Sequence, residues 1–391
     1  MKVELLGVVL AAGCAVQAFG QGASPTPAAA ATGGSGYNKN AFTIGDGSAN
    51  SLSLGGTMQF RYIGNLRDED SAGSQNDFTQ GFQMARTRLR AKGSIWDKNL
   101  TYQIQGDFAR NSGEFTLLDA FAQYTFENKA WIKWGQYKLP LLREEVVSHM
   151  YQLAVNRSTT NAVFTGTRVQ GVQVGWEGED VRITGDLTDG LNTLNTDFTA
   201  AAEADLAGTA RAEWKFAGDG WAWAKDFTSF RGSPFAGMVG AAIHGQTGGE
   251  TGFTTDRDLI EATVDVSLEG DGWNAFGALI WRNTDAGGSE TDDFGAVVQG
   301  GVFLSDDAEL FARWDALFPD DSNGDDFHTV TGGVNYYVAP QSHAFKLTAD
   351  VQYLLDNPAD TAIFSANTSL GTLTDTEEGQ WVIRLQAQLV F

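Results

Sequence analysis

The last eleven residues of the chain, 381–391, alternate between apolar and other side chains. Every odd position from Trp381 to Phe391 is apolar, whereas the even positions include Arg384 and two glutamines. A period of two over about ten residues is typical of a β-strand with one apolar and one polar face. The chain must therefore build a sheet whose one face meets an apolar environment.

The same alternation recurs from about residue 51 onward, in about 16 runs, and two clear examples are 260–268 and 345–353. Single-chain bacterial membrane barrels have an even number of antiparallel strands. The run that stops at Phe391 resembles the closing strand of these barrels, whose terminal Phe is part of the signal read by the barrel-assembly machinery. We therefore predict an all-β fold, a transmembrane antiparallel β-barrel of about 16 strands over residues 51–391.

The connections between these runs alternate in length. Six are short enough for turns, namely 97–99, 127–129, 177–180, 269–271, 305–307 and 339–342. Those between them are longer, namely 65–80, 139–167, 188–205, 247–256, 284–291, 318–326 and 356–378. Membrane barrels have short periplasmic turns and longer outer loops, so the alternation has the sidedness of a barrel. One connection on the short side, 217–234, is too long for a turn and indicates a missed hairpin or a separate role.

The amino terminus has the pattern of a secretory signal peptide, which we assign to residues 1–20. Cys14 lies in this segment, so lipidation is an alternative, although Ala11 stands where a lipoprotein signal usually has Leu. Residues 21–50 are rich in Ala, Pro and Gly and are expected to form a flexible tether and periplasmic lead-in.

Several segments resemble the phosphate-selective porin O and P family. The resemblance is carried by the arginine-rich segment 82–93, by 102–109, by 135–145, and by the Arg-Ser and Gly-Thr-Arg sequences in 156–158 and 166–168. This resemblance implies a sixteen-stranded, homotrimeric porin of the bacterial outer membrane, with phosphate or polyphosphate as candidate solutes. The chain departs from the family pattern at Tyr137, Leu141 and Asn156.

Four cations, Arg86, Arg88, Arg90 and Lys92, are spaced by two and therefore project from one face of a strand. A cation that faces lipid near the bilayer midplane costs about 2–4 kcal/mol, so this face must be the lumen. A barrel of this size leaves a water-filled channel. We interpret the four residues as a cation ladder for anions; the alternative is that they pair with lumenal carboxylates.

Strand parity elsewhere places nine basic and nine acidic side chains in the lumen, so that with the four cations of the ladder the wall carries 13 basic and 9 acidic side chains, although the chain has a net charge of −23. The basic residues placed there are Arg61, Lys133, Arg182, Arg211, Lys215, Arg282, Arg313, Lys346 and Arg384, and the acidic ones are Asp107, Asp119, Asp186, Glu213, Glu261, Asp265, Glu309, Asp315 and Asp350. A basic lumen favours anions whatever the charge of the outer loops.

The longest loop, 139–167, is apolar enough to pack against a wall, and by analogy with general porins we predict that it folds inward and narrows the pore. The candidate constriction residues are Lys138, Arg143, Glu144, Glu145, Arg157 and Arg168, together with His149. These side chains either line the constriction or hold the loop to the wall by ion pairs.

The four histidines have no metal-ligand spacing, and no motif singles out a catalytic serine. We therefore predict no metal, no cofactor, no enzymatic activity and no nucleic-acid partner. The sequence predicts an outer-membrane porin, in contact with lipid, whose channel passes small hydrophilic and preferably anionic solutes. The alternative is a non-conducting surface barrel that binds partners through its acidic loops.

Overall fold

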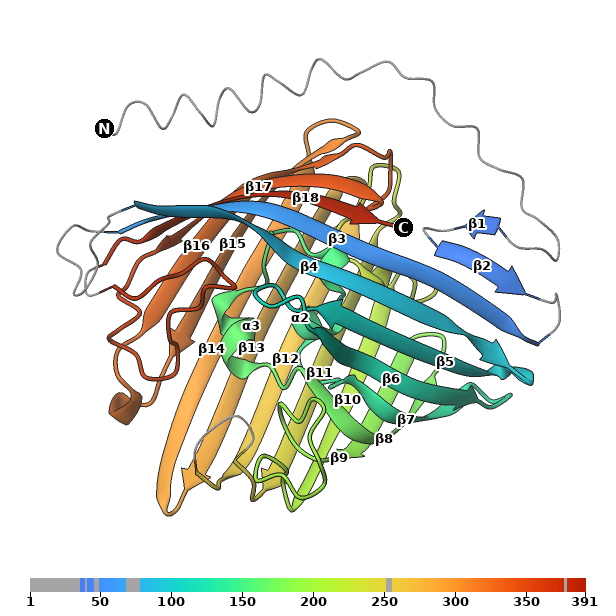
Figure 1. Cartoon of the computed structure of the whole chain (residues 1–391), viewed down its shortest axis with the longest axis horizontal. Helices are drawn as coiled ribbons and strands as arrows, with labels where there is room; N and C mark the ends of the chain where they lie inside the picture. The colour runs from blue at the N-terminus through green and yellow to red at the C-terminus, as the bar shows by residue number, and fades with distance from the viewer. Residues whose placement is uncertain (1–35, 39–40, 46–48, 68–77, 251–254, 376–377) are drawn as a thin grey trace. The chain divides into compact units, whose positions relative to one another are not determined.

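The computed structural model describes residues 36–38, 41–45, 49–67, 78–250, 255–375 and 378–391. Within them, the sixteen strands β3 to β18 form a closed antiparallel barrel (Figure 1). Each strand pairs with the next along the chain, and β18 pairs with β3 from Trp381↔Leu66 to Val390↔Thr57. The predicted barrel of about 16 strands is therefore confirmed. The signal segment with Cys14, and most of the predicted tether, lie outside the described residues.

The barrel strands are β3 (Ser51–Leu66), β4 (Phe78–Ile95), β5 (Asp97–Phe108), β6 (Phe115–Thr125), β7 (Ala130–Lys138), β8 (Arg168–Glu177), β9 (Val181–Thr188), β10 (Leu206–Ala217), β11 (Ala236–Thr247), β12 (Asp258–Gly270), β13 (Trp273–Ala286), β14 (Ser289–Phe303), β15 (Ala308–Phe318), β16 (Phe327–Tyr337), β17 (Phe345–Leu354) and β18 (Trp381–Val390). Two short strands, β1 (Gly36–Asn38) and β2 (Ala41–Gly45), pair with each other, and β2 pairs with the start of β3.

The helical segments are short: α2 (Arg143–Val146), η2 (His149–Tyr151), α3 (Thr159–Phe164), η3 (Trp223–Lys225) and η4 (Asp321–Asn323). No helix among the described residues is long and apolar enough to cross a membrane.

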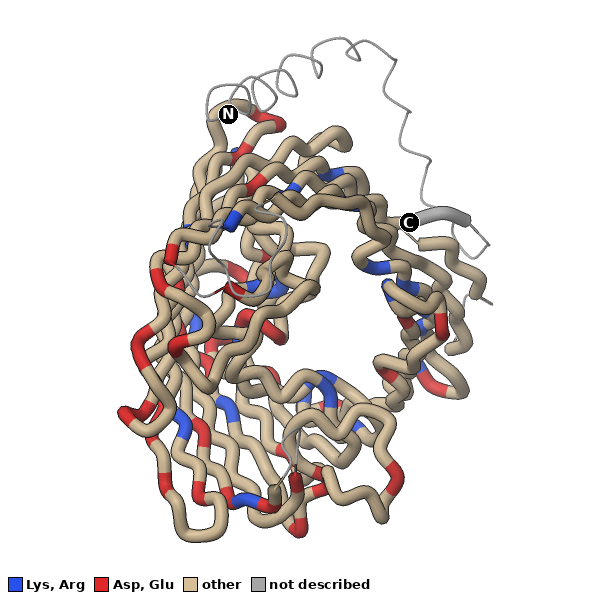
Figure 2. Tube along the Cα trace, turned by 60° about the vertical axis from the view of Figure 1, so that its left-hand side comes forward, with Lys and Arg blue, Asp and Glu red and all other residues tan. Residues whose placement is uncertain are grey.

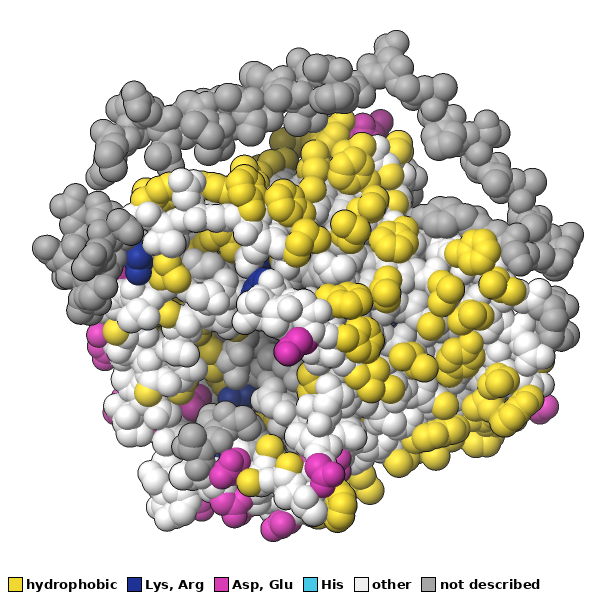
Figure 3. Space-filling model, in the orientation of Figure 1, with side chains coloured by type: hydrophobic (Ala, Val, Ile, Leu, Met, Phe, Trp, Pro, Cys, Tyr) yellow, Lys and Arg dark blue, Asp and Glu magenta, His cyan; other side chains and the backbone are white. Residues whose placement is uncertain are grey.

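The alternation along each strand separates an outer face from a lumen face. In β18, Trp381, Leu385 and Leu389 are exposed, whereas Arg384 and Gln388 between them are buried. Figure 2 shows Lys and Arg positions within the ring of strands and many Asp and Glu positions in the connections at its ends. Exposed apolar side chains cover a wide part of the outer surface (Figure 3), as a wall that faces lipid requires.

The carboxyl terminus completes the closure of the barrel. The amide of Phe391 donates to the carbonyl of Gly56 at 3.0 Å, and the amide of Gly56 donates to the carbonyl of Phe391 at 2.6 Å. The ring of Phe391 lies over Gly56, because a Cβ at this glycine would come within 2.7 Å of the ring and 2.8 Å of the Arg88 carbonyl. The closing contact therefore needs both a residue at position 391 and a glycine opposite it.

Deletion of Phe391 should lower the amount of folded protein in the outer membrane. The deletion removes two backbone hydrogen bonds at the seam and leaves part of a strand edge unpaired in an apolar medium. The measurement is heat-modifiable migration of the outer-membrane fraction on gels. The substitution Phe391→Tyr keeps the ring and the backbone contacts and serves as the control, with folded protein near the wild-type level. Unchanged levels after the deletion would contradict the prediction.

The connections differ between the two ends of the barrel. At the short-turn end they are residue 96 and segments 126–129, 178–180, 271–272, 304–307 and 338–344. The other end carries longer connections that include 139–167, 189–205 and 355–380. The predicted loop 284–291 is wrong in extent, because β13 and β14 pair as far as Ala286↔Ser289. Gly287 and Gly288, with φ of 66° and 89°, form the tight turn there.

The long connection on the short-turn side spans residues 218–235 and contains the short helix η3 but no strand. A missed hairpin is therefore not the reason for its length.

Candidate functional site

The connection between β7 and β8, residues 139–167, lies inside the ring of strands with α2 and α3 (Figure 1). Its apolar side chains pack on the wall in two clusters. In the first, Leu139, Leu141 and Phe164 pack with lumen-facing residues such as Leu317 and Val382. In the second, residues 147, 153 and 154 pack with residues 276, 297 and 311. The loop therefore covers the lumen face of strands β11 to β18.

Cations of the wall bind main-chain carbonyls of this loop. The pairs are Arg211 with Leu141 (3.1 Å), Lys346 with Gln152 (2.8 Å), Arg61 with Val155 (3.5 Å), Arg313 with Asn156 (2.9 Å) and Arg282 with Val163 (3.2 Å). Wall carboxylates bind main-chain amides of the loop in the same way: Asp350 accepts from Val155 at 2.8 Å, and Asp315 from Thr159 at 2.8 Å. Many lumen charges thus hold the loop instead of facing water.

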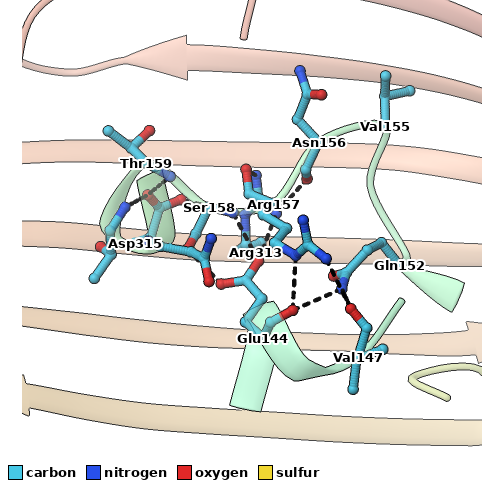
Figure 4. Close-up of polar contacts among 12 residues, drawn as sticks. Glu144, Val147, Gln152, Val155, Asn156, Arg157, Ser158, Thr159, Arg313 and Asp315 are labelled. Carbon is cyan, nitrogen blue, oxygen red and sulfur yellow. Dashed lines mark hydrogen bonds and ion pairs between the residues drawn. The ribbon is translucent and has the colours of Figure 1, made fainter. Parts of the chain in front are cut away.

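Glu144 is at the centre of a second set of contacts within the loop (Figure 4). Its carboxylate accepts from the amide of Ser158 at 2.7 Å and from its hydroxyl at 2.5 Å, and Arg313 of β15 lies 3.7 Å away. Arg157 donates to the main-chain carbonyls of Glu144 at 2.8 Å and Val147 at 2.9 Å. These contacts join the two ends of the loop to each other and to the wall.

Glu145 and its partners form the neighbouring ion-pair cluster. Its carboxylate lies 3.2 Å from Arg157 and 3.5 Å from Lys138. Burial opposes the ionisation of Glu145, but the two cations outweigh this effect and lower its pKa to about 2. Burial raises the pKa of Glu144, which has the weaker cation contact. Burial also lowers the pKa of Arg143 to about 10, and its Nε donates to the Ser267 hydroxyl at 2.6 Å.

The substitution Asp315→Ala should destabilise the barrel by about 3–5 kcal/mol, the usual range for removing one partner of a buried ion pair. Arg313, whose side chain is 1% exposed, would lose the carboxylate at 3.3 Å, and Thr159 would lose its acceptor. The measurement is the free energy of unfolding in urea, with lipid or detergent present. Asp326→Ala, in an exposed outer loop, removes the same charge and should change this free energy little. Equal effects of the two substitutions would contradict the prediction.

The cation ladder of β4 depends on a bulge. Gln59 of β3 pairs with Arg86, but the next residue, Phe60, pairs with Met84, so Ala85 has no partner of its own. The bulge reverses the parity of the strand. Phe82 therefore stacks on Phe60 on the outer surface, with ring centroids 5.5 Å apart, while Arg86 turns to the lumen. The alternation of the sequence alone would put Phe82 and Arg86 on one face.

The members of the ladder have different surroundings. Arg86 donates to Gln59 at 2.8 Å. Arg88 forms an ion pair with Asp107 at 2.8 Å and contacts Nδ1 of His149 at 3.0 Å. Arg90 has no hydrogen bond or ion pair within the described part of the chain.

His149 adds no positive charge to this contact. Because arginine can only donate, Nδ1 of His149 accepts from Arg88. Burial and the neighbouring arginines lower the pKa of His149 well below its ordinary value, so the ring is neutral near pH 7.

A cavity of about 410 Å³ lies between the cation ladder, the loop and the wall from β5 to β10. Its lining includes seven basic side chains and three acidic ones. The basic residues are Arg88, Arg90, Lys133, Lys138, Arg168, Arg182 and Arg211, and the acidic ones are Asp119, Glu177 and Glu213. The loop contributes Pro140, Val146, Ser148 and His149 to the opposite side.

The predicted site residues thus divide into two groups. Arg88 and Arg90 of the ladder, and Lys138 and Arg168 of the constriction candidates, line the cavity. Arg143, Glu144, Glu145 and Arg157 do not line it, since they lie in the contacts that hold the loop. Arg86 and Lys92 of the ladder do not line it, and Lys92 is exposed farther along β4.

Lys133 is a lining residue that the search for motifs did not single out. Its ammonium lies about 5 Å from three rings: 5.1 Å from the centroid of Phe121, 4.9 Å from that of Trp131 and 5.4 Å from that of Tyr137. Strand parity assigns Lys133 to the lumen, and its strand, β7, lies only two strands from β5. These two observations together are the signal that could have placed Lys133 in the site.

The described residues include no group of three or more His, Cys, Asp and Glu side chains arranged to hold a metal ion. The seven basic and three acidic side chains of the lining can attract anions electrostatically.

Comparison with known proteins agrees with this geometry. The family model described as phosphate-selective porin O and P matches residues 57–220. No curated protein matches the chain. Among solved structures, the barrel is similar to the anion-selective porin from Comamonas acidovorans, with a TM-score of 0.62, 13% identity, and coverage of 88% of this chain and 100% of that one.

Two further structures have the same fold. OmpT of Vibrio cholerae has a TM-score of 0.58 at 13% identity, and the outer membrane channel DcaP of Acinetobacter baumannii has 0.58 at 14%. Each comparison covers 88% of this chain and 98% of the other. The chain is an outer-membrane β-barrel porin, and its residues 57–220 match the model of the phosphate-selective porin O and P family.

Proposed function

We propose that this porin is an anion-preferring channel whose solutes pass along the β4–β10 wall, beside the inward-folded loop. The observation that carries the proposal is the lining of the cavity, with seven basic and three acidic side chains. The carboxylates of Glu144 and Glu145 do not offset this excess, because they are buried and bonded within the loop. A water-filled passage with this lining lowers the energy of an anion relative to a cation.

The resemblance to the phosphate-selective family makes phosphate or polyphosphate the first solutes to examine. Arginine suits such anions, since its planar donors match phosphate oxygens. We also propose that the porin is a homotrimer inserted by the barrel-assembly machinery; a trimer form of OmpT from Vibrio cholerae, which has the same fold, supports the first part.

The test is single-channel recording in planar lipid bilayers. The purified protein should give discrete open steps, and the reversal potential in a KCl gradient should show a preference for chloride. Added phosphate should lower the chloride current if it occupies the same passage. A preference for potassium would refute the anion proposal. The absence of any steps would favour the alternative of a non-conducting barrel that binds partners through its outer loops.

A further inference from the structure

The connection 218–235 differs from every other connection at its end of the barrel, and its contacts show where it runs. Trp221 donates from its ring nitrogen to the carbonyl of Gly178, in the β8–β9 turn, at 3.0 Å. The hydroxyl of Ser229 donates to the carbonyl of Gly270, at the β12–β13 turn, at 2.5 Å. Arg231 donates to the carbonyl of Phe303, at the β14–β15 turn, at 2.9 Å.

The segment reaches the β16–β17 connection as well. The Thr228 hydroxyl lies 2.9 Å from that of Tyr337, and Asp226 lies 2.8 Å from Nε2 of His343. These contacts extend from β8 to β17, so the segment crosses the mouth of the barrel on that side. It is tightly held, because Trp221, Thr228 and Ser229 are buried.

The middle of segment 218–235 contacts the inward-folded loop. The amide of Phe227 donates to the carbonyl of Tyr151, in the loop, at 3.2 Å. The ring of Phe227 lies 4.8 Å from that of Phe276 on the wall and belongs to the same apolar cluster as Val147 and Leu153 of the loop. The two segments thus enter the barrel from opposite ends and meet inside it.

A second cavity, of about 620 Å³, lies where the segment begins. Gly220 and Trp221 form part of its lining, opposite Lys129 and Gln123. This cavity shares Trp131 and Glu177 with the basic cavity above it. The two cavities therefore adjoin each other at Trp131 and Glu177, and Trp221 lines only the second one.

Trp221 is held in this position by a cation. The guanidinium carbon of Arg182, which lines the basic cavity, lies 4.2 Å from the centroid of the Trp221 ring. A cation at this distance over an indole face is attracted to it. Arg182 of the basic cavity and Trp221 of segment 218–235 thus contact each other directly.

We propose that residues 218–235 form a second constriction element, a fixed floor at the periplasmic end. This floor confines the passage to the side of β3 to β9, and Trp221 sets the width of its exit. Short-turn ends are periplasmic in outer-membrane barrels, which gives the floor its side. The proposal rests on the proposed function, since it describes the exit of the same channel.

The first experiment replaces residues 218–235 with Asn-Gly. β10 and β11 still pair at Ala217↔Gly237, so a three-residue loop of Asn, Gly and Ala236 can join them. Heat-modifiable migration on gels first shows that the variant forms a folded barrel. The single-channel conductance of the variant is then compared with that of the wild type, and liposome swelling is measured with neutral sugars of increasing size. The floor predicts a higher conductance and a larger size limit. A folded variant with the wild-type conductance and size limit overturns the proposal.

The second experiment needs no change of backbone. Trp221→Ala should raise the conductance, while Trp214→Ala should not, because Trp214 is on the outer face of β10 and 55% exposed. If the shortened variant does not fold, the two single substitutions test the proposal instead. Equal conductances of the Trp221→Ala and Trp214→Ala channels would overturn it. A wild type without channel activity would overturn the proposed function together with the floor, whereas a conducting wild type with unresponsive variants overturns the floor alone.

Discussion

Replacing Arg86, Arg88 and Arg90 with glutamate should abolish the anion preference of the channel and turn its selectivity toward cations. Two of these residues line the basic cavity, so its seven basic and three acidic side chains would become five of each, and the third residue adds a negative charge two positions away on the same strand. Positions two apart on a strand are separated by about 6–7 Å, so the three charges act on the same stretch of the passage. The measurement is the reversal potential in a KCl gradient.

The matched control for this variant keeps the charge. The three lysine substitutions should retain the anion preference, because the lumen charge is unchanged although the planar donors are lost. Arg90→Glu alone should give a partial shift at little risk to folding, since no hydrogen bond or ion pair within the described residues holds Arg90. All shifts should shrink at 1 M salt, where the Debye length is about 3 Å. An unmoved reversal potential in the folded triple glutamate variant would refute the ladder.

Excision of most of the inward-folded loop should raise the single-channel conductance and admit larger neutral solutes. The loop covers the lumen face of β11 to β18, and its removal opens that part of the lumen to water. The anion preference should persist, because the seven basic side chains of the cavity lining lie on strands β4 to β10 and are not removed with the loop. The measurements are conductance, liposome swelling and reversal potential on a barrel shown to be folded.

The control for this excision is an exposed stretch of another connection at the same end. Residues 197–202, between β9 and β10, are mostly exposed, and their replacement by Gly-Ser should leave the conductance unchanged. Equal conductance of the loop-deleted channel and the wild type would mean that solutes never crossed the covered side, and the loop would then not be a constriction.

Much of the fold could be predicted from local pattern. A strand that faces lipid on one side and water on the other records both faces in its sequence, so runs such as Trp381 to Phe391 reveal the strand and the side of each residue. The lumen position of Lys133 and of Arg182 follows from the same parity. Connection lengths likewise revealed the two ends of the barrel and the unusual segment 218–235.

The features that the sequence pattern could not predict depend on contacts between distant parts of the chain. The bulge at Ala85 is a register shift between two strands, and only the pairing of Gln59 with Arg86 reveals it. Whether an acid faces the pore or is bonded behind it depends on partners elsewhere: Glu144 is bonded to Ser158 and near Arg313 of β15. The course of 218–235 likewise depends on turns that the sequence does not bring near it.

Several charged side chains of the wall hold the inward-folded loop by its backbone. Arg211, Lys346 and Arg313 bind carbonyls, and Asp350 binds an amide, groups that every residue except proline offers in the same form. Side chains that point from the loop into the passage, such as Val146, can therefore change without loosening this attachment. A barrel with such anchors can acquire a new solute preference by mutation of its loop while the wall that secures it stays the same.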